Sequence, residues 1–138
     1  MPSLTVPANL EQLSQVKEYI HTQVPKDYTS VLDHILLAAE ELLVNVFTHA
    51  YQEGQGQAEL HCRVVVHNKK EYLCLTVKDW GPYFNPFSNA PDPNVDLNIE
   101  DRPIGGLGIY LIKAITAHTE YKRLEDTNIV DLYFEKKL

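Results

Sequence analysis

The longest periodic stretch of this sequence is TSVLDHILLAAEELLVNVFTHAY, residues 29–51. Apolar residues recur in it every three or four positions, which is the spacing that places side chains on one face of an α-helix. The members of this apolar face are Ile35, Ala39, Leu42, Val46 and Ala50. Such a helix needs a second layer against which to bury that face, so we expect it to lie on a sheet.

Strands with period-two alternation follow this helix. Apolar and polar residues alternate in residues 60–66 and again in residues 73–77, after which the second stretch ends at Asp79. The residues between the two stretches, Asn68-Lys69-Lys70, supply a tight connection, which predicts a β-hairpin. Two further strands are expected near residues 120–124 and 129–136, where Val130, Leu132 and Phe134 share one face.

The remaining elements complete an α+β fold. Residues 3–6 are β-prone, and Asn9 can cap a helix that reaches about residue 22. We expect this helix to have an apolar stripe made of Leu10, Leu13, Val16 and Ile20. Because the strands come mainly in hairpins, we predict a two-layer α/β sandwich: a mixed, mostly antiparallel sheet with three helices on one face.

Composition limits the classes of function. The 138 residues suit a single domain, residues 1–138, and the net charge of −7 argues against electrostatic binding to nucleic acid or anionic membranes. Cys62 and Cys74 fall in apolar runs and are typical of core residues in a reducing compartment. The sequence has no signal peptide pattern and no apolar run of membrane-spanning length, so we expect a cytoplasmic protein.

Residues 82–104 differ from the rest of the chain. They hold five of the eight prolines, many Asn and Asp residues, and little periodicity. Compact domains seldom carry a structureless loop of this length unless it serves a function, so we expect a lid over a binding site.

Two polar residues of the long helix are candidates for a metal site. Glu41 and Asn45 are four residues apart, so they share one helix face, and His49 continues that face one turn later. A carboxylate and an amide oxygen suit a hard cation such as Mg²⁺, which keeps several water or phosphate oxygens. The same pair also fits a solvated helix face, and the neighbouring Glu40 is consistent with that alternative.

Two glycine-containing motifs are candidates for contacts with a nucleotide. Asp79 at a strand end could accept a hydrogen bond from an exocyclic amine such as that of adenine, with Gly81 allowing close approach of the backbone. The cluster Gly105-Gly106-Leu107-Gly108 opens a helix, and free N–H groups there attract phosphate. Each motif also has an ordinary explanation, as a strand-to-turn boundary and as a flexible connection.

In this order, the motifs resemble those of the GHKL ATPase superfamily, which has the Bergerat fold. The match is closest to the bacterial anti-sigma-factor serine/threonine kinases. Their Glu-x-x-x-Asn-x-x-x-His-x-Tyr run is similar to residues 41–51, and their Asp-x-Gly-x-x-Phe-Asp-Pro run is similar to residues 79–86. The likeness continues through residues 105–112 and a final strand with Asn128, and it covers essentially the whole chain. Three positions depart from it: Tyr83 replaces a glycine, Thr127 replaces another, and no arginine adjoins the glycine cluster.

The resemblance implies a function for each motif. Asn45 would hold Mg²⁺, and Glu41 would be the general base that takes a proton from a serine or threonine hydroxyl. The implied residues of the ATP site are Asn45, His49, Asp79, Gly81, Gly105, Gly106, Leu107 and Gly108. The implied substrate is a STAS-domain antagonist protein, with a sigma factor as a further partner and a homodimer as a possible assembly.

Two alternatives stay open beside the kinase. One is a regulatory module that binds ATP or docks partners without catalysis. The other is the catalytic domain of a sensor histidine kinase; the chain shows no phospho-accepting helix pair ahead of the domain, which counts against it.

Overall fold

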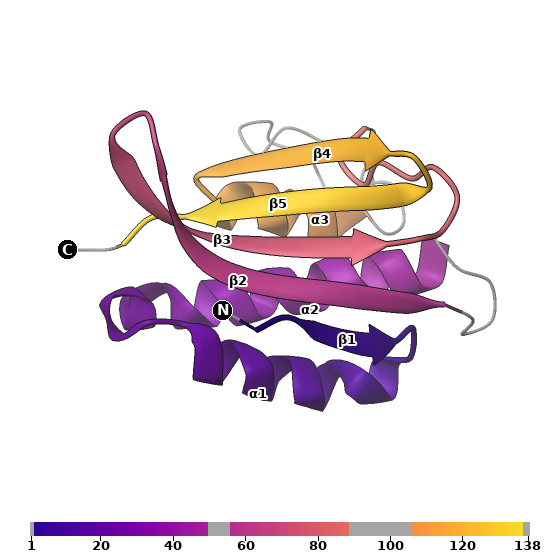
Figure 1. Ribbon diagram of the computed structural model, residues 1–138, viewed down its shortest axis with the longest axis horizontal. Coiled ribbons are helices and arrows are strands. Elements are labelled where there is room, and N and C mark those ends of the chain that lie inside the picture. The colour runs from indigo at the N-terminus through magenta and orange to yellow at the C-terminus, as the bar shows by residue number, and fades with distance from the viewer. Residues whose placement is uncertain (1, 50–55, 89–105, 137–138) are drawn as a thin grey trace.

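The protein, described here by a computed structural model over residues 2–49, 56–88 and 106–136, is a five-stranded sheet with helices packed on one face (Figure 1). Along the chain the elements are β1 (Leu4–Pro7), η1 (Leu10–Gln12), α1 (Leu13–Gln23), η2 (Lys26–Val31), α2 (Leu32–His49), β2 (Gln57–His67), β3 (Lys70–Asp79), α3 (Gly106–Ile115), β4 (His118–Leu124) and β5 (Thr127–Phe134). The strand order is β1-β2-β3-β5-β4, and every neighbouring pair is antiparallel. The predicted α+β fold is confirmed.

Helix α2 is the centre of the helical layer. The predicted apolar face is buried from Ile35 to Val46, while Ala50 lies outside the described residues. Burial extends further than predicted, to Ala38, Leu43 and Phe47, because α2 packs against α1 and α3 as well as against the sheet. Even so, none of the helices within the described ranges is both long and apolar enough to cross a membrane.

The first helical segment differs from its prediction at Leu10. Asn9 does act as a cap, since its side-chain oxygen accepts a hydrogen bond from the Glu11 N–H at 2.9 Å. The first turn is a 3₁₀ helix, however, and only Leu13–Gln23 are α-helical. A 3₁₀ turn has three residues per turn, so Leu10 falls out of the stripe and is 54% exposed, whereas Val16 and Ile20 are buried.

The β2–β3 hairpin forms as predicted and places Asp79. Asn68 and Lys69 both have positive φ angles, 51° and 66°, as a tight two-residue hairpin loop requires. Unbroken pairing from His67↔Lys70 to Ala58↔Asp79 then fixes the register. Side chains alternate along β3, and Leu73, Leu75 and Val77 lie in the core. The same alternation directs Asp79 to the face that carries the helices.

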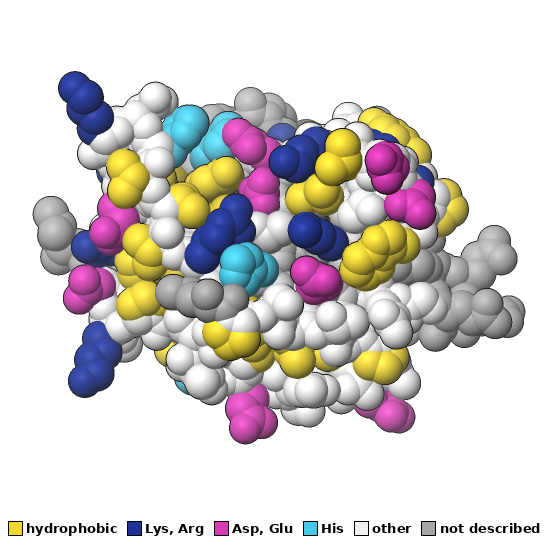
Figure 2. Space-filling model, in the orientation of Figure 1, with side chains coloured by type: hydrophobic (Ala, Val, Ile, Leu, Met, Phe, Trp, Pro, Cys, Tyr) yellow, Lys and Arg dark blue, Asp and Glu magenta, His cyan; other side chains and the backbone are white. Residues whose placement is uncertain are grey.

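On the opposite face of the sheet, no helix is present among residues 2–49, 56–88 and 106–136. Figure 2 shows this face, with Lys and Arg side chains, acidic side chains and histidines distributed over the strands. At its centre the Arg63 guanidinium donates to the Thr76 hydroxyl at 2.7 Å, and that hydroxyl donates to Asp131 at 2.6 Å. This polar side is consistent with a two-layer sandwich.

The beginning of α2 is held to the sheet by a buried tyrosine. The Tyr28 hydroxyl donates to the Glu71 carboxylate at 2.9 Å, and Lys136 pairs with the same carboxylate at 2.7 Å. Hydrogen bonds, first from Lys136 and then from Tyr28, lower the pKa of Glu71 below its ordinary value.

This arrangement predicts a pH dependence of stability. The pKa of Glu71 is lower in the folded chain than in the unfolded chain, so its stabilising effect is present above the ordinary pKa of 4.5 and is lost as the pH falls through the folded-state pKa. Tyr28→Phe removes one of the two donors, and we expect the loss of stability on acidification to shrink. Urea unfolding at a series of pH values measures the free energy of unfolding of the parent and of Tyr28→Phe. Glu71→Gln, which lacks the carboxyl group, is the reference. Identical pH profiles for Tyr28→Phe and the parent would contradict the assignment.

The two cysteines are core residues, as predicted. Both are free thiols with no exposed surface. Burial raises the pKa of the Cys62 thiol to about 12 and raises the pKa of Cys74 as well. The reactive thiolate is therefore scarce at neutral pH.

We expect both thiols to be protected from alkylation in the folded protein. The native chain should react with a thiol reagent such as Ellman's reagent far more slowly than the same chain in urea, where both cysteines become available. Rapid reaction of either thiol under native conditions would show that it is not buried.

Candidate functional site

The predicted site residues gather at one end of the sandwich. Figure 1 shows that α2 and β3 both end at the right-hand side of the molecule. Helix α3 begins at the same side and runs to the left, where it leads into β4. The helix with Glu41 and Asn45, the strand end with Asp79 and the glycine-containing helix start therefore lie at the same end of the molecule.

Glu41 and Gly108 are in direct contact. Glu41 lies in the middle of α2, one turn before Asn45, and both side chains are half-buried. The Oε2 atom of Glu41 lies so close to Gly108 that a β-carbon at position 108 would overlap with it. The structure thus brings together two predicted site residues that are far apart in sequence.

Asp79 is a buried carboxylate whose two oxygens have different surroundings. It is 3% exposed, and its Oδ1 accepts hydrogen bonds from the Gly81 N–H at 3.0 Å and from the Asn128 amide at 2.8 Å. Among the described residues, no group donates to Oδ2. A buried acceptor of this kind is expected to find a donor, and an exocyclic amine of a ligand would serve.

The position of Asp79 depends on Asn128, whose role the sequence did not reveal. Asn128 is 1% exposed and uses its whole amide group. Its Nδ2 donates to Asp79 and, at 2.9 Å, to the Pro82 carbonyl, while its Oδ1 accepts from the Phe84 N–H at 3.2 Å and from the Tyr121 hydroxyl. Asn128 therefore fixes both the carboxylate and the turn that follows it. The available clue was an amide inside the apolar run of the last strand.

Arg123 is a second residue that sequence reasoning missed. Its Nη1 donates to the Gly81 carbonyl at 2.7 Å, and its Nε donates to the Glu125 carbonyl at 3.1 Å. Tyr83 and Tyr121 pack edge to face beside it, with ring centroids 5.6 Å apart. The β4–β5 hairpin thus holds the turn that begins at Gly81.

The predicted lid, residues 82–104, is described over its first seven residues. Phe84 and Phe87 pack against the core, Pro86 is buried, and the Asn85 side chain accepts a hydrogen bond from the Phe87 N–H at 2.9 Å. This part is attached to the body of the protein, so a lid would begin after it. Residues 89–104 lie outside the described residues, and the lid stays a prediction for them.

The other predicted residues are only partly described. His49 is the last residue of α2, and Gly106 and Leu107 form the start of α3, but their surroundings are not described. Gly105 lies outside the described residues.

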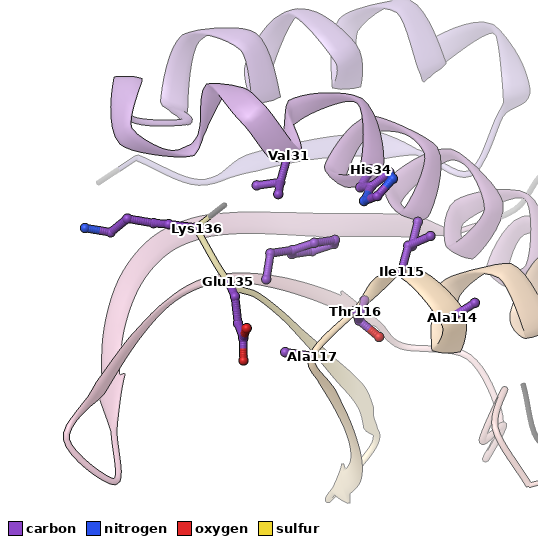
Figure 3. Close-up of a pocket in the computed structure, with 9 residues that line it drawn as sticks. Val31, His34, Ala114, Ile115, Thr116, Ala117, Glu135 and Lys136 are labelled. Carbon is purple, nitrogen blue, oxygen red and sulfur yellow. The ribbon is translucent and has the colours of Figure 1, made fainter. Parts of the chain in front are cut away.

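A separate cavity lies at the other end of the two helices. It has a volume of about 310 Å³ and lies between His34 of α2, Ile115 at the end of α3, and Phe134 and Lys136 of the β5 end (Figure 3). Of the predicted site residues whose surroundings are described, namely Glu41, Asn45, Asp79, Gly81 and Gly108, none lines it. This cavity is therefore distinct from the predicted site.

The residues present fit a nucleotide with magnesium. The Oδ2 of Asp79, which accepts from no group in the described part of the chain, suits an amine donor, and the N-terminus of a helix such as α3 suits an anion. In the described ranges, no group of three or more His, Cys, Asp or Glu side chains could hold a metal. Asn45 as a ligand of Mg²⁺ stays a prediction; phosphate and water oxygens would supply the other ligands.

Comparison with known proteins identifies the family. The model of the histidine kinase-like ATPase domain matches residues 6–134. The chain belongs to this family. Among solved structures, it is similar to the histidine kinase domain from the Erythrobacter litoralis EL346 blue-light activated histidine kinase, with 19% identity and a TM-score of 0.50. That similarity covers 95% of this chain and 62% of the other, and it shows the fold alone. No significant match was found among curated proteins.

Loss of the Asn128 amide should destabilise the ATPase domain. Asn128→Ala removes one of the two donors to the buried Asp79 carboxylate, the other being the Gly81 N–H, and it removes the side-chain donor to the Pro82 carbonyl. This loss is expected to cost about 1–3 kcal/mol. Urea unfolding measures the change, and Lys122→Ala, at an exposed position of β4, is the matched control, with an expected effect within about 0.5 kcal/mol. Equal stability of the two variants would show that Asn128 does not hold this region.

Proposed function

We propose that this chain is an ATP-dependent protein serine/threonine kinase of the anti-sigma type, which phosphorylates a STAS-domain antagonist protein. The observation that carries the proposal is the contact between the Glu41 carboxylate and Gly108 in the first turn of α3. Membership of the ATPase-domain family supports nucleotide binding. An acid beside the phosphate end of that site supports transfer in addition to binding.

Each end of the nucleotide has residues suited to it. The Oδ2 atom of Asp79 would accept a hydrogen bond from the adenine amine, next to the closely approaching backbone of Gly81. Gly106, Leu107 and Gly108 would offer backbone N–H groups to the phosphates. Gly105 and His49 are the further residues that we propose for the ATP site. Asn45 would hold Mg²⁺, which when bound neutralises phosphate charge.

Glu41 would act on the protein substrate. As the serine or threonine oxygen bonds to the γ-phosphorus of ATP, the bond from that phosphorus to the β–γ bridging oxygen breaks and ADP leaves. The hydroxyl proton moves to the Glu41 carboxylate. The half-buried position of Glu41, one turn from Asn45, suits an acid that must lie near the γ-phosphate and still meet a hydroxyl from outside.

The partner follows from the proposed branch of the family. A phosphate on the antagonist adds nearly two negative charges, enough to break or form a protein contact, and release of a sigma factor would follow from such a switch. We place the reaction in the cytoplasm, and a homodimer is compatible with it. A pull-down from the native cell with mass spectrometry would identify the partner.

A regulatory module without catalysis is the second candidate. It would keep the buried Asp79 and the Asn128 hydrogen bonds, which serve binding, but it would have no use for an acid at position 41. The half-buried Glu41 beside Gly108 favours the kinase.

Two substitutions separate binding from transfer. Glu41→Gln should lower the rate of phosphate transfer to the STAS-domain protein identified in the pull-down by about 10²–10⁴-fold, because the base is lost. The same substitution should leave the Kd for ATP nearly unchanged. Asp79→Asn should weaken ATP binding, because the acceptor for the amine is altered. Radiolabelled ATP measures transfer, and calorimetry measures binding. If Glu41→Gln transfers phosphate at the parent rate, Glu41 is not the base.

A further inference from the structure

Gly108 is a glycine where the backbone does not require one. It is the third residue of α3, and its helical conformation is open to any residue. A glycine in a helix is less favourable than an alanine, because it loses more backbone freedom on folding. The surroundings of Gly108 therefore decide whether a side chain could be accommodated there.

The carboxylate of Glu41 occupies the space that a side chain on Gly108 would need. A β-carbon on Gly108 would overlap with Oε2 of Glu41, yet it would lie 3.4 Å from the Glu41 Cδ and 3.6 Å from its Cβ. The last two separations are tolerable contacts. The conflict is thus with the carboxylate oxygen alone, and the backbones of the two helices leave room for a β-carbon.

The helices themselves are not free to separate. Leu42 of α2 and Ile109 and Ile112 of α3 belong to one buried core cluster, which fixes how the two helices pack. Close-packed cores resist such movements more than a terminal carboxylate does. A side chain at position 108 would therefore move the Glu41 carboxylate and leave the helices in place.

We infer that Gly108 is a positioning residue for phosphate transfer. Because Gly108 has no side chain, the Glu41 carboxylate can occupy the space beside it. That location sets the direction from which the carboxylate meets the substrate hydroxyl. This inference rests on the proposed function of Glu41 as the general base. It differs from a contact of the Gly108 backbone with phosphate, which would govern ATP affinity. Positioning of the base governs the rate of transfer instead.

A double-mutant cycle tests the inference. Gly108→Ala should lower the transfer rate at least tenfold and change the Kd for ATP by no more than about twofold, since the backbone N–H remains. Glu41→Asp shortens the side chain by one methylene, which withdraws the carboxylate from position 108. In the Glu41→Asp background, adding Gly108→Ala should therefore have almost no further effect on the rate.

The control and the contrary outcome are equally specific. Ala114→Gly, at an exposed position in the same helix, changes helix propensity without approaching Glu41 and should leave the transfer rate unchanged. If the effects of Gly108→Ala and Glu41→Asp simply multiply, the two positions are independent and the inference is wrong. The inference is also wrong if Gly108→Ala weakens ATP binding as much as it slows transfer.

A spectroscopic readout separates this inference from the proposed function. The side-chain carboxyl ¹³C resonance of Glu41, assigned with Glu41→Gln, should shift in Gly108→Ala and stay in place in Ala114→Gly. An unshifted resonance in Gly108→Ala would overturn the positioning role whatever the activity. A shifted resonance, together with phosphate transfer by Glu41→Gln at the parent rate, would keep the contact between the two residues and show that Glu41 is not the general base.

Discussion

The pairing of β3 with β5 is the constraint on which the described part of the site depends. It sets Asp79 directly opposite Asn128, where β3 ends and β5 begins, on the face of the sheet that the helices cover. From that single register follow the burial of the carboxylate, the hydrogen bond from the Asn128 amide to its Oδ1, and the attachment of the Gly81–Phe84 turn. A slip of one residue would turn Asp79 to the opposite face of the sheet and undo all three.

The two halves of the site are built by different forces. At the strand end, a closed set of hydrogen bonds among buried polar groups holds Asp79, and such a set is rigid because each missing bond is costly. At the helices, the contact between Glu41 and Gly108 is steric and depends on the packing of apolar residues behind it. The first region is therefore expected to be more rigid than the second, because a terminal carboxylate can move more easily than a buried set of hydrogen-bonded groups.

Local patterns were sufficient for the fold, and less so for the site. Periodicity identified the buried face of α2, and the Asn68-Lys69 loop identified the hairpin, because these features depend on neighbours in sequence. The prediction that Leu10 belongs to the apolar stripe of the first helix was wrong, because this part of the chain forms a 3₁₀ turn and not an α-helix. Asn128 and Arg123 could not be assigned their roles from the sequence, since their partners lie more than 40 residues away across strands. Residue types and spacing made the motif residues candidates, and a resemblance implied a role for each. The contact of Gly108 with Glu41 could not be predicted, because the two residues lie on different helices.

The contact between Gly108 and Glu41 also restricts which residues can occupy the two positions together in related chains. A chain that acquires any side chain at position 108 must shorten, redirect or lose the acid at position 41, and a chain that loses the acid is freed to fill position 108 and gain helix stability. Among related chains, a side chain at position 108 should therefore coincide with a shorter, redirected or absent acid at position 41, whereas a glycine at position 108 leaves either choice open at position 41.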